Sequence, residues 1–154
     1  MRAYARKYGE DEARWGLAGL IHDFDWERHP SAELHPVKGV EILRGLGWPD
    51  DICEAVLGHA THTGVARESR MAKVLFACDE LSGFLVACSL VTPERKLASV
   101  AVESVRKKMK SSGFAKNVSR DDIVNGAAEL GVDLDAHISF VKDAMLAIAP
   151  ELGL

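Results

Sequence analysis

Apolar residues recur every three or four positions along nearly the whole chain, and no segment alternates apolar and polar residues as a β-strand does. This spacing predicts helices over about residues 1–8, 12–24, 36–45, 49–59, 70–91, 119–130 and 134–149. The segment 70–91 is apolar on almost every side, a pattern expected of a helix that others cover. The sequence therefore predicts an all-α fold, a compact multi-helix bundle around a central buried helix.

Residues that begin and end helices support these boundaries. Pro36 and Pro49 stand where helices favour proline, and Ser119 followed by Asp122 resembles a capping box. A basic amphipathic helix is predicted to begin at Pro93. Its inner face is expected to consist of Leu97, Val100, Ala101 and Val105. The inner face of the last helix is expected to consist of Ile138, Val141, Met145 and Ile148.

Length, charge and cysteine content limit the possible classes of protein. A chain of 154 residues is expected to form one domain, residues 1–154, and its net charge of −4 argues against binding duplex nucleic acid. The three cysteines form no CxxC motif and are predicted to be reduced and buried. Residues 1–8 lack the apolar core of a signal peptide, and the apolar stretch 81–91 is shorter than the roughly 20 residues that span a bilayer. We expect a cytoplasmic protein without a membrane partner.

The pair His22-Asp23 closes an apolar run, where an imidazole and a carboxylate are costly unless something compensates them. A divalent metal accepts both groups, and His35, His59 and Asp79 lie further along beside apolar residues. Mixed nitrogen and oxygen ligands suit Mn, Fe, Co, Ni or Zn. Taken singly, however, Asp79 fits a buried salt bridge and His59 a core histidine. The remaining histidines, His29, His62 and His137, are interpreted as loop or structural residues.

The strings Gly16-Leu-Ala-Gly-Leu-Ile-His-Asp23, His35-Pro-Val-Lys-Gly39, Gly58-His-Ala60 and Ala77-Cys-Asp-Glu-Leu-Ser-Gly83 resemble the HD-domain superfamily of metal-dependent phosphohydrolases, in particular its small HDIG-like members. The resemblance covers about residues 5–125. It implies an all-α core that holds one or two divalent transition-metal ions. The ligands it implies are His22, Asp23 and Asp79, with His35 and His59 binding a second ion or contacting phosphate.

The chain departs from the pattern of that family at two places. Family members carry a further histidine on a helix before the His-Asp pair, and no histidine precedes His22. A truncated N-terminus is therefore expected, with the loss of one metal ligand. Many members also carry a lysine shortly after the pair, where this chain has the residues 24–27 (Phe-Asp-Trp-Glu). Hydrolysis of cyclic dinucleotides is thus less expected than hydrolysis of a smaller phosphoester.

Other polar residues are candidates for catalysis and substrate binding. Glu80 and Asp25 are the carboxylates nearest the ligands in sequence, and either is a candidate general base. Glu80 is equally a candidate partner of a ligating histidine. In the basic segment 95–120, Lys96 and Lys108 are candidates to bind substrate phosphate, although a solvated helix face explains the same charges.

The hypothesis that follows is a metal-dependent phosphohydrolase that cleaves a nucleotide or another small phosphoester with a metal-activated water. The alternative is a catalytically impaired HD-fold module that binds a nucleotide or metabolite and acts in regulation. A purely structural helical domain with a buried polar network is a third, weaker interpretation. The sequence leaves the substrate, the metal and the oligomeric state open.

Overall fold

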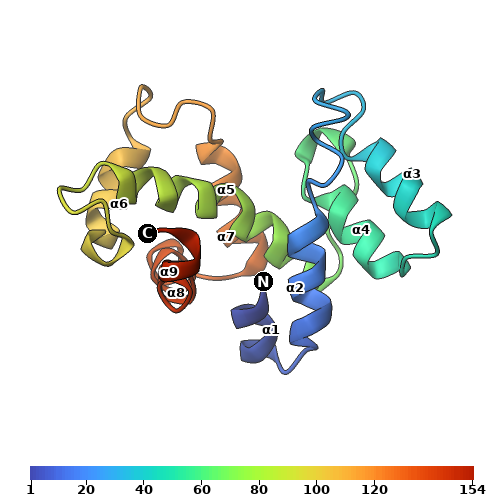
Figure 1. Cartoon of the computed structure of the whole chain (residues 1–154), viewed down its shortest axis with the longest axis horizontal. Helices are drawn as coiled ribbons and strands as arrows, with labels where there is room; N and C mark the ends of the chain where they lie inside the picture. The colour runs from blue at the N-terminus through green and yellow to red at the C-terminus, as the bar shows by residue number, and fades with distance from the viewer. The chain divides into compact units, whose positions relative to one another are not determined.

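A computed structural model describes residues 1–154 as nine α-helices and two short 3-10 helices, without a β-strand (Figure 1). The predicted all-α fold is therefore confirmed. The chain forms two compact units, residues 1–76 and 77–154, and the boundary between them falls inside helix α5 (Arg70–Leu90). The prediction of one domain over residues 1–154 stays a prediction.

The first unit contains four helices and one 3-10 turn. They are α1 (Arg2–Tyr8), α2 (Glu12–Ile21), α3 (Val37–Gly45), α4 (Asp50–Gly58) and η1 (Thr61–Thr63). Helix α2 packs against α1 and α4, and α4 packs against α3, beside which it lies in Figure 1. The core of this unit is built from Tyr4, Trp15, Ala18, Val40, Leu43, Ile52 and Val56.

Local signals explain where α2 begins and how it is held. Gly9 ends α1 with a left-handed φ of 71°, which a side chain would disfavour, and Asp11 then caps α2 by accepting the backbone N–H groups of Ala13 and Arg14. The guanidinium of Arg14 forms an ion pair with Asp51 of α4. This ion pair joins the first turns of α2 and α4, the two helices whose C-terminal ends carry candidate ligands.

Helix α5 has the buried character that its sequence predicts. Its side chains Val74, Leu75, Phe76, Leu81, Phe84 and Leu85 are almost completely removed from solvent. The three cysteines are buried and form no disulfide, also as predicted. Burial raises the pKa of the Cys78 thiol to about 11, so this cysteine is unreactive at neutral pH. No helix in the structure has both the length and the apolar content to cross a membrane.

The second unit continues from α5 into η2 (Leu97–Ser99), α6 (Val102–Met109), α7 (Arg120–Leu130), α8 (Leu134–Leu146) and α9 (Ala149–Leu152). Helix α8 packs against α6, α7 and η2. The buried His137 on α8 donates from Nε2 to the carbonyl of Ala77 at 2.8 Å. The structural interpretation of His137 is therefore confirmed.

Three helix boundaries predicted from the sequence are wrong. No helix begins at Pro93, because the hydroxyl of Thr92 accepts the N–H of Lys96 and Arg95 takes a left-handed φ of 52°, so the chain turns and α6 begins at Val102. Leu97, Val100 and Val105 are nevertheless buried as expected, whereas Ala101 is exposed. The helix predicted over 12–24 ends at Ile21, and the one predicted over 134–149 ends at Leu146, so that Ile148, expected to face inward, is exposed.

Two glycines provide a test of packing against α5. A Cβ added at Gly126 on α7 would lie 2.6 Å from the backbone Cα of Ala77, whereas one added at Gly83 would meet nothing within 4 Å. We expect Gly126→Ala to lower the free energy of unfolding by about 1–3 kcal/mol through overpacking. Gly83→Ala is the matched control and is expected to raise it by about 0.5–1 kcal/mol through helix propensity. Urea denaturation monitored by circular dichroism measures both, and equal effects of the two substitutions would contradict the packing.

Candidate metal centre

Three histidines of the first unit stand at chain turns, and a backbone or carboxylate acceptor orients each of them. His22 is the C-cap of α2 and its Nδ1 lies 2.8 Å from the carbonyl oxygen of Gly19. His59 is the C-cap of α4 and its Nδ1 lies 2.5 Å from the carbonyl oxygen of Val56. Carbonyl oxygens only accept hydrogen bonds, so each Nδ1 carries the proton. A ring that is protonated at Nδ1 alone presents a lone pair at Nε2.

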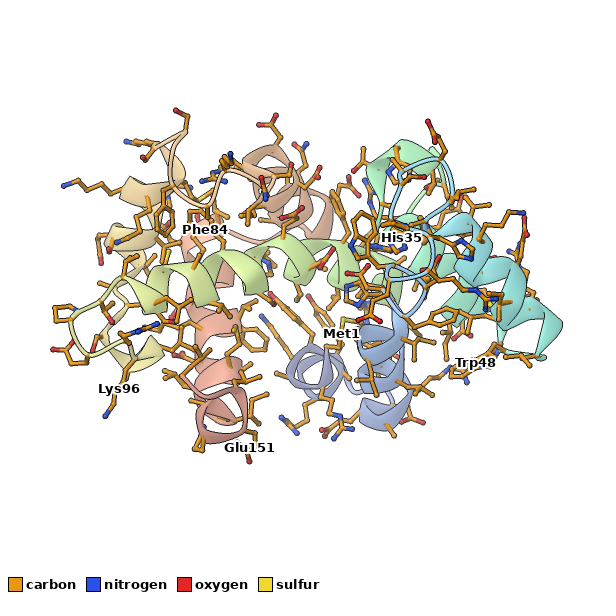
Figure 2. All side chains as sticks on the ribbon, turned by 45° about the horizontal axis from the view of Figure 1, so that its top comes forward. Met1, His35, Trp48, Phe84, Lys96 and Glu151 are labelled. Atoms are coloured by element: carbon orange, nitrogen blue, oxygen red, sulfur yellow. The ribbon has the colours of Figure 1, made fainter.

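His35 lies in the turn before α3 and is almost completely buried (Figure 2). Its Nδ1 lies 2.8 Å from Oδ1 of Asp25. Asp25 is also buried, and its Oδ2 accepts the backbone N–H of Gly39 at 3.0 Å. An ionised Asp25 satisfies both contacts, so Nδ1 of His35 is the protonated nitrogen here too. The lone pair of His35 is again at Nε2.

The Nε2 atoms of His35 and His59 converge with Oδ1 of Asp23. Oδ1 of Asp23 lies 3.1 Å from Nε2 of His35 and 3.3 Å from Nε2 of His59, and the two nitrogens are 3.2 Å apart. An ion bound at about 2.1 Å separates neighbouring ligand atoms by about 3.0 Å in an octahedral site and about 3.4 Å in a tetrahedral one. The three atoms are therefore spaced as ligands of one transition-metal ion.

The protonation of this cluster also favours a cation. Two lone pairs 3.2 Å apart, both facing a carboxylate oxygen, repel one another unless a proton or a metal ion lies among them. His35 and His59 are buried, whereas Asp23 is exposed. A divalent ion neutralises the carboxylate and accepts both lone pairs, so the donor set fits a metal.

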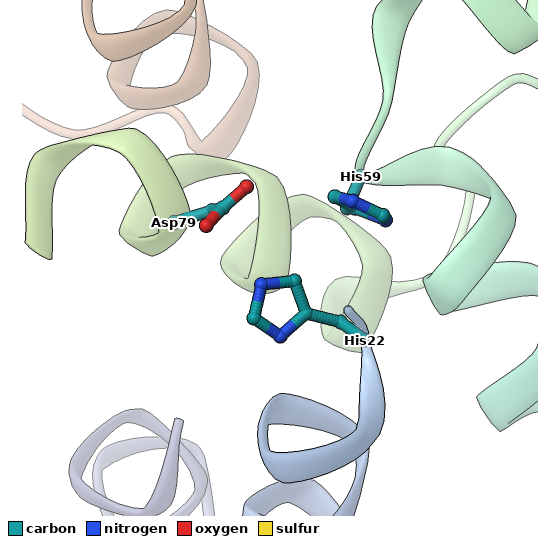
Figure 3. Close-up of side chains that lie close together, drawn as sticks. All are labelled: His22, His59 and Asp79. Atoms are coloured by element: carbon teal, nitrogen blue, oxygen red, sulfur yellow. The ribbon is translucent and has the colours of Figure 1, made fainter. Parts of the chain in front are cut away.

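Asp23 is the carboxylate that connects the three rings. Its Oδ2 lies 3.4 Å from Nε2 of His22, on the other side of the group from the oxygen that faces His35 and His59. The His22 and His59 rings also meet edge to face, with centroids 5.1 Å apart (Figure 3). When Nε2 of His59 carries a proton, its hydrogen bond and the nearby imidazoles hold the pKa of Asp23 below its usual range, against the effect of partial desolvation. Asp23 is thus ionised at neutral pH and available to one ion or to two.

The position of Asp25 does not fit the predicted role of a general base, which needs a free carboxylate oxygen within reach of water. Both of its oxygens are occupied, one by His35 and one by Gly39, and its side chain is almost fully buried. The geometry therefore favours a positioning role, because a carboxylate on the distal nitrogen fixes the orientation of a ligating histidine and raises its basicity. Gly39 belongs to this arrangement, since a Cβ there would lie 2.6 Å from Cγ of Asp25.

The positioning role of Asp25 predicts a measurable effect on metal affinity. We expect Asp25→Asn to weaken metal binding about 10- to 100-fold, because one amide oxygen cannot serve both His35 and Gly39 and carries no charge. Competition with a chromogenic chelator measures this affinity. Asp143→Asn, an exposed position on α8, is the matched control. An Asp25→Asn protein with the affinity of the control would contradict the role.

The candidate acidic residues on α5 lie beyond the boundary between the two units. Asp79 is partly buried and projects from α5 as drawn in Figure 3. Glu80 accepts the backbone N–H of Ser119, the N-cap of α7, at 3.1 Å. Burial raises the pKa of Glu80, and the negative charges of Asp79 and Asp122 raise it further, whereas the Ser119 N–H and Arg120 lower it. A carboxylate with a raised pKa is a better proton acceptor than an ordinary surface glutamate.

The two candidate phosphate-binding lysines lie in the second unit. Lys96 is exposed in the turn before η2, and its side chain extends away from the ribbon in Figure 2. Lys108 on α6 donates to the hydroxyl of Ser104 at 2.8 Å and lies over the ring of Phe114. A role in binding phosphate stays a prediction for both residues.

Sequence reasoning missed two neighbours of the centre. His62 is exposed as predicted, but it lies in the 3-10 helix η1 rather than in a loop, and its Nε2 donates to the carbonyl of His35 at 2.8 Å, which ties η1 to the turn that carries a candidate ligand. Trp26 lies in the string that replaces the lysine, and its ring meets the imidazole of His35 edge to face. Neither contact has a signal in the sequence, because both depend on how the turn folds.

Residues 1–83 match the family model described as HD domain. The match covers more than half of the 154 residues and includes every candidate metal ligand named above. No curated protein and no solved structure matches the chain.

Proposed function

This chain belongs to the HD-domain family, and from that premise we propose that it is a metal-dependent phosphohydrolase acting on a nucleotide or another small phosphoester. The observation that carries the proposal is the convergence of Asp23 Oδ1 with Nε2 of His35 and of His59, at separations of 3.1–3.3 Å. Such a donor set suits Mn, Fe, Co, Ni or Zn, as one ion or two.

The proposed ligand set extends beyond these three residues. His22 is included because its Nε2 faces the second oxygen of Asp23. Asp79 is included because the family pattern places an aspartate at this point after the His-Asp pair and because it projects from a continuous helix. A divalent ion held by these groups supplies positive charge for the phosphoryl oxygens and lowers the pKa of water.

The remaining residues have separate proposed roles. Glu80 accepts a proton from the attacking water, a role that its raised pKa supports. Asp25 holds His35 so that Nε2 points toward Asp23 and His59. Lys96 and Lys108 supply positive charge for the substrate phosphate, Lys96 from an exposed position. The exposed carboxylate of Asp23 beside buried histidines leaves one side of the centre open to substrate and water.

A phosphatase panel tests the proposal. The purified protein is incubated with nucleoside phosphates, sugar phosphates and glycerol phosphate in the presence of Mn, Fe, Co, Ni or Zn, and released phosphate is measured. We expect release with at least one metal, and its loss in His59→Ala but not in His29→Ala, a histidine outside the cluster. Metal binding without release of phosphate from any substrate would instead favour the regulatory binding module.

A further inference from the structure

An indole beside the metal centre is left half exposed. The exposed fraction of Trp26 is 48%, whereas Trp15 in the core is 3% exposed. Its ring meets the His35 imidazole edge to face, with centroids 5.0 Å apart and planes at 88°. Phe24, Leu34 and Val37, in the same stretch of chain, are exposed as well. Large apolar side chains that remain exposed to water beside the cluster of candidate metal ligands indicate a ligand-binding surface.

The same contacts that form the centre hold the backbone of Trp26 in place. Its N–H donates to the carbonyl of Asp23, a candidate ligand, at 2.9 Å. The next residue back is Asp25, which is buried and bonded to both His35 and Gly39. The backbone of Trp26 is therefore tied to the cluster and its ring rests against His35, which lowers the ordering cost of stacking on its exposed surface.

We propose that Trp26 is a specificity-determining residue whose exposed indole stacks on a flat aromatic ring of the substrate. The inference rests on the proposed function, since it assumes that the phosphate binds at the cluster. A metal ion about 2.1 Å from Nε2 of His35 would lie at most roughly 8 Å from the centre of the Trp26 ring, and a phosphate oxygen on that ion about 2 Å further. The phosphate and ribose of a mononucleotide together span that distance, which favours nucleoside phosphates over phosphoesters of aliphatic alcohols.

A purely structural role for Trp26 is the competing explanation. The indole covers one side of His35, and a cover protects a ligating imidazole from water. That role needs only the part of the ring that touches His35 and leaves the exposed half unexplained. It also needs no aromatic character, so leucine at this position covers His35 but does not stack on a base.

Isothermal titration with two matched ligands tests the inference. The ligands are the phosphonate analogues of adenosine monophosphate and of ribose 5-phosphate, which share the metal-binding group and resist hydrolysis, and the protein is loaded with Mn²⁺. We expect the adenosine analogue to bind about tenfold more tightly, a gain typical of one stacked base. Trp26→Leu is expected to bind both equally, with its affinity for the ribose analogue unchanged, while Trp26→Phe and the control Phe24→Leu keep most of the preference.

Three results would overturn the inference. They are equal binding of the two analogues by the wild type, an undiminished preference in Trp26→Leu, and no binding of either analogue by the Mn²⁺-loaded protein. Release of phosphate from glycerol phosphate is measured separately and reports on the proposed hydrolysis alone. A protein that hydrolyses glycerol phosphate but shows no preference for the base keeps its function and loses this inference. A protein that prefers the adenosine analogue through Trp26 but hydrolyses no substrate keeps this inference and loses the proposed function.

Discussion

Replacing Asp23 by asparagine is expected to lower both metal affinity and phosphate release by more than about 100-fold. Losing a residue that only orients a metal ligand lowers metal affinity or activity about 10- to 100-fold. A larger loss is expected here because Asp23 is proposed as a ligand itself. Its two oxygens face three imidazoles, so the substitution removes the negative charge that would bind the ion together with Nε2 of His35 and of His59. Chelator competition and a phosphate-release assay measure the two effects.

Asp143→Asn is the control for that substitution, since it makes the same chemical change on an exposed face of α8. It should leave both quantities within twofold of the wild type. Circular dichroism of each variant shows whether the helices are intact. A folded Asp23→Asn protein that binds metal as tightly as the control would contradict the assignment of Asp23 as a ligand.

Replacing Glu80 by glutamine is expected to lower kcat by about 10²- to 10⁴-fold, the usual contribution of a positioned general base, while the protein becomes more stable. The folded state raises the pKa of Glu80, chiefly through burial, so the ionised form is the costly one. This loss of stability develops as pH rises through the pKa that Glu80 has in the unfolded protein and then through its higher pKa in the folded protein, and it is fully present at neutral pH. Glutamine removes it, and its oxygen still accepts the N–H of Ser119.

Thermal unfolding at pH 7 and at pH 4 measures the second effect. The Glu80→Gln protein should melt at a higher temperature than the wild type at pH 7, and the difference should shrink at pH 4, where Glu80 approaches its neutral form. Glu103→Gln, an exposed glutamate on α6, is the matched control. A variant that loses kcat and also loses stability at pH 7 would show that Glu80 acts through the fold rather than as a base.

The sequence predicts most helices because their signals are local. The apolar spacing of α5 and the cap at Ser119 each act within a few residues, and the structure confirms them. The helix predicted from Pro93 is wrong for an equally local reason, the turn that the Thr92 hydroxyl closes. Apolar spacing still identifies Leu97 and Val105 as buried, because it reports which side chains face the core and not where a helix begins.

The centre is predictable only in part. The order of His22-Asp23, His35 and His59 along the chain identifies candidate ligands, and the structure brings these four together. The role of Asp25 cannot be predicted in this way, since its contacts with His35 and Gly39 depend on how a polar turn folds back on α3. The exposure of Trp26 beside His35 depends on the same turn, so the proposed stacking on a base could not be predicted from the sequence either.

The most direct test of the central claim is the metal content of the chain. The protein is purified without chelator or metal-affinity resin, dialysed after addition of Mn, Fe, Co, Ni or Zn, and measured by elemental mass spectrometry. The account predicts one or two transition-metal ions per chain, retained through dialysis and absent from Asp23→Asn. A wild-type chain that retains no ion with any of these metals, while its helices remain folded, would contradict it.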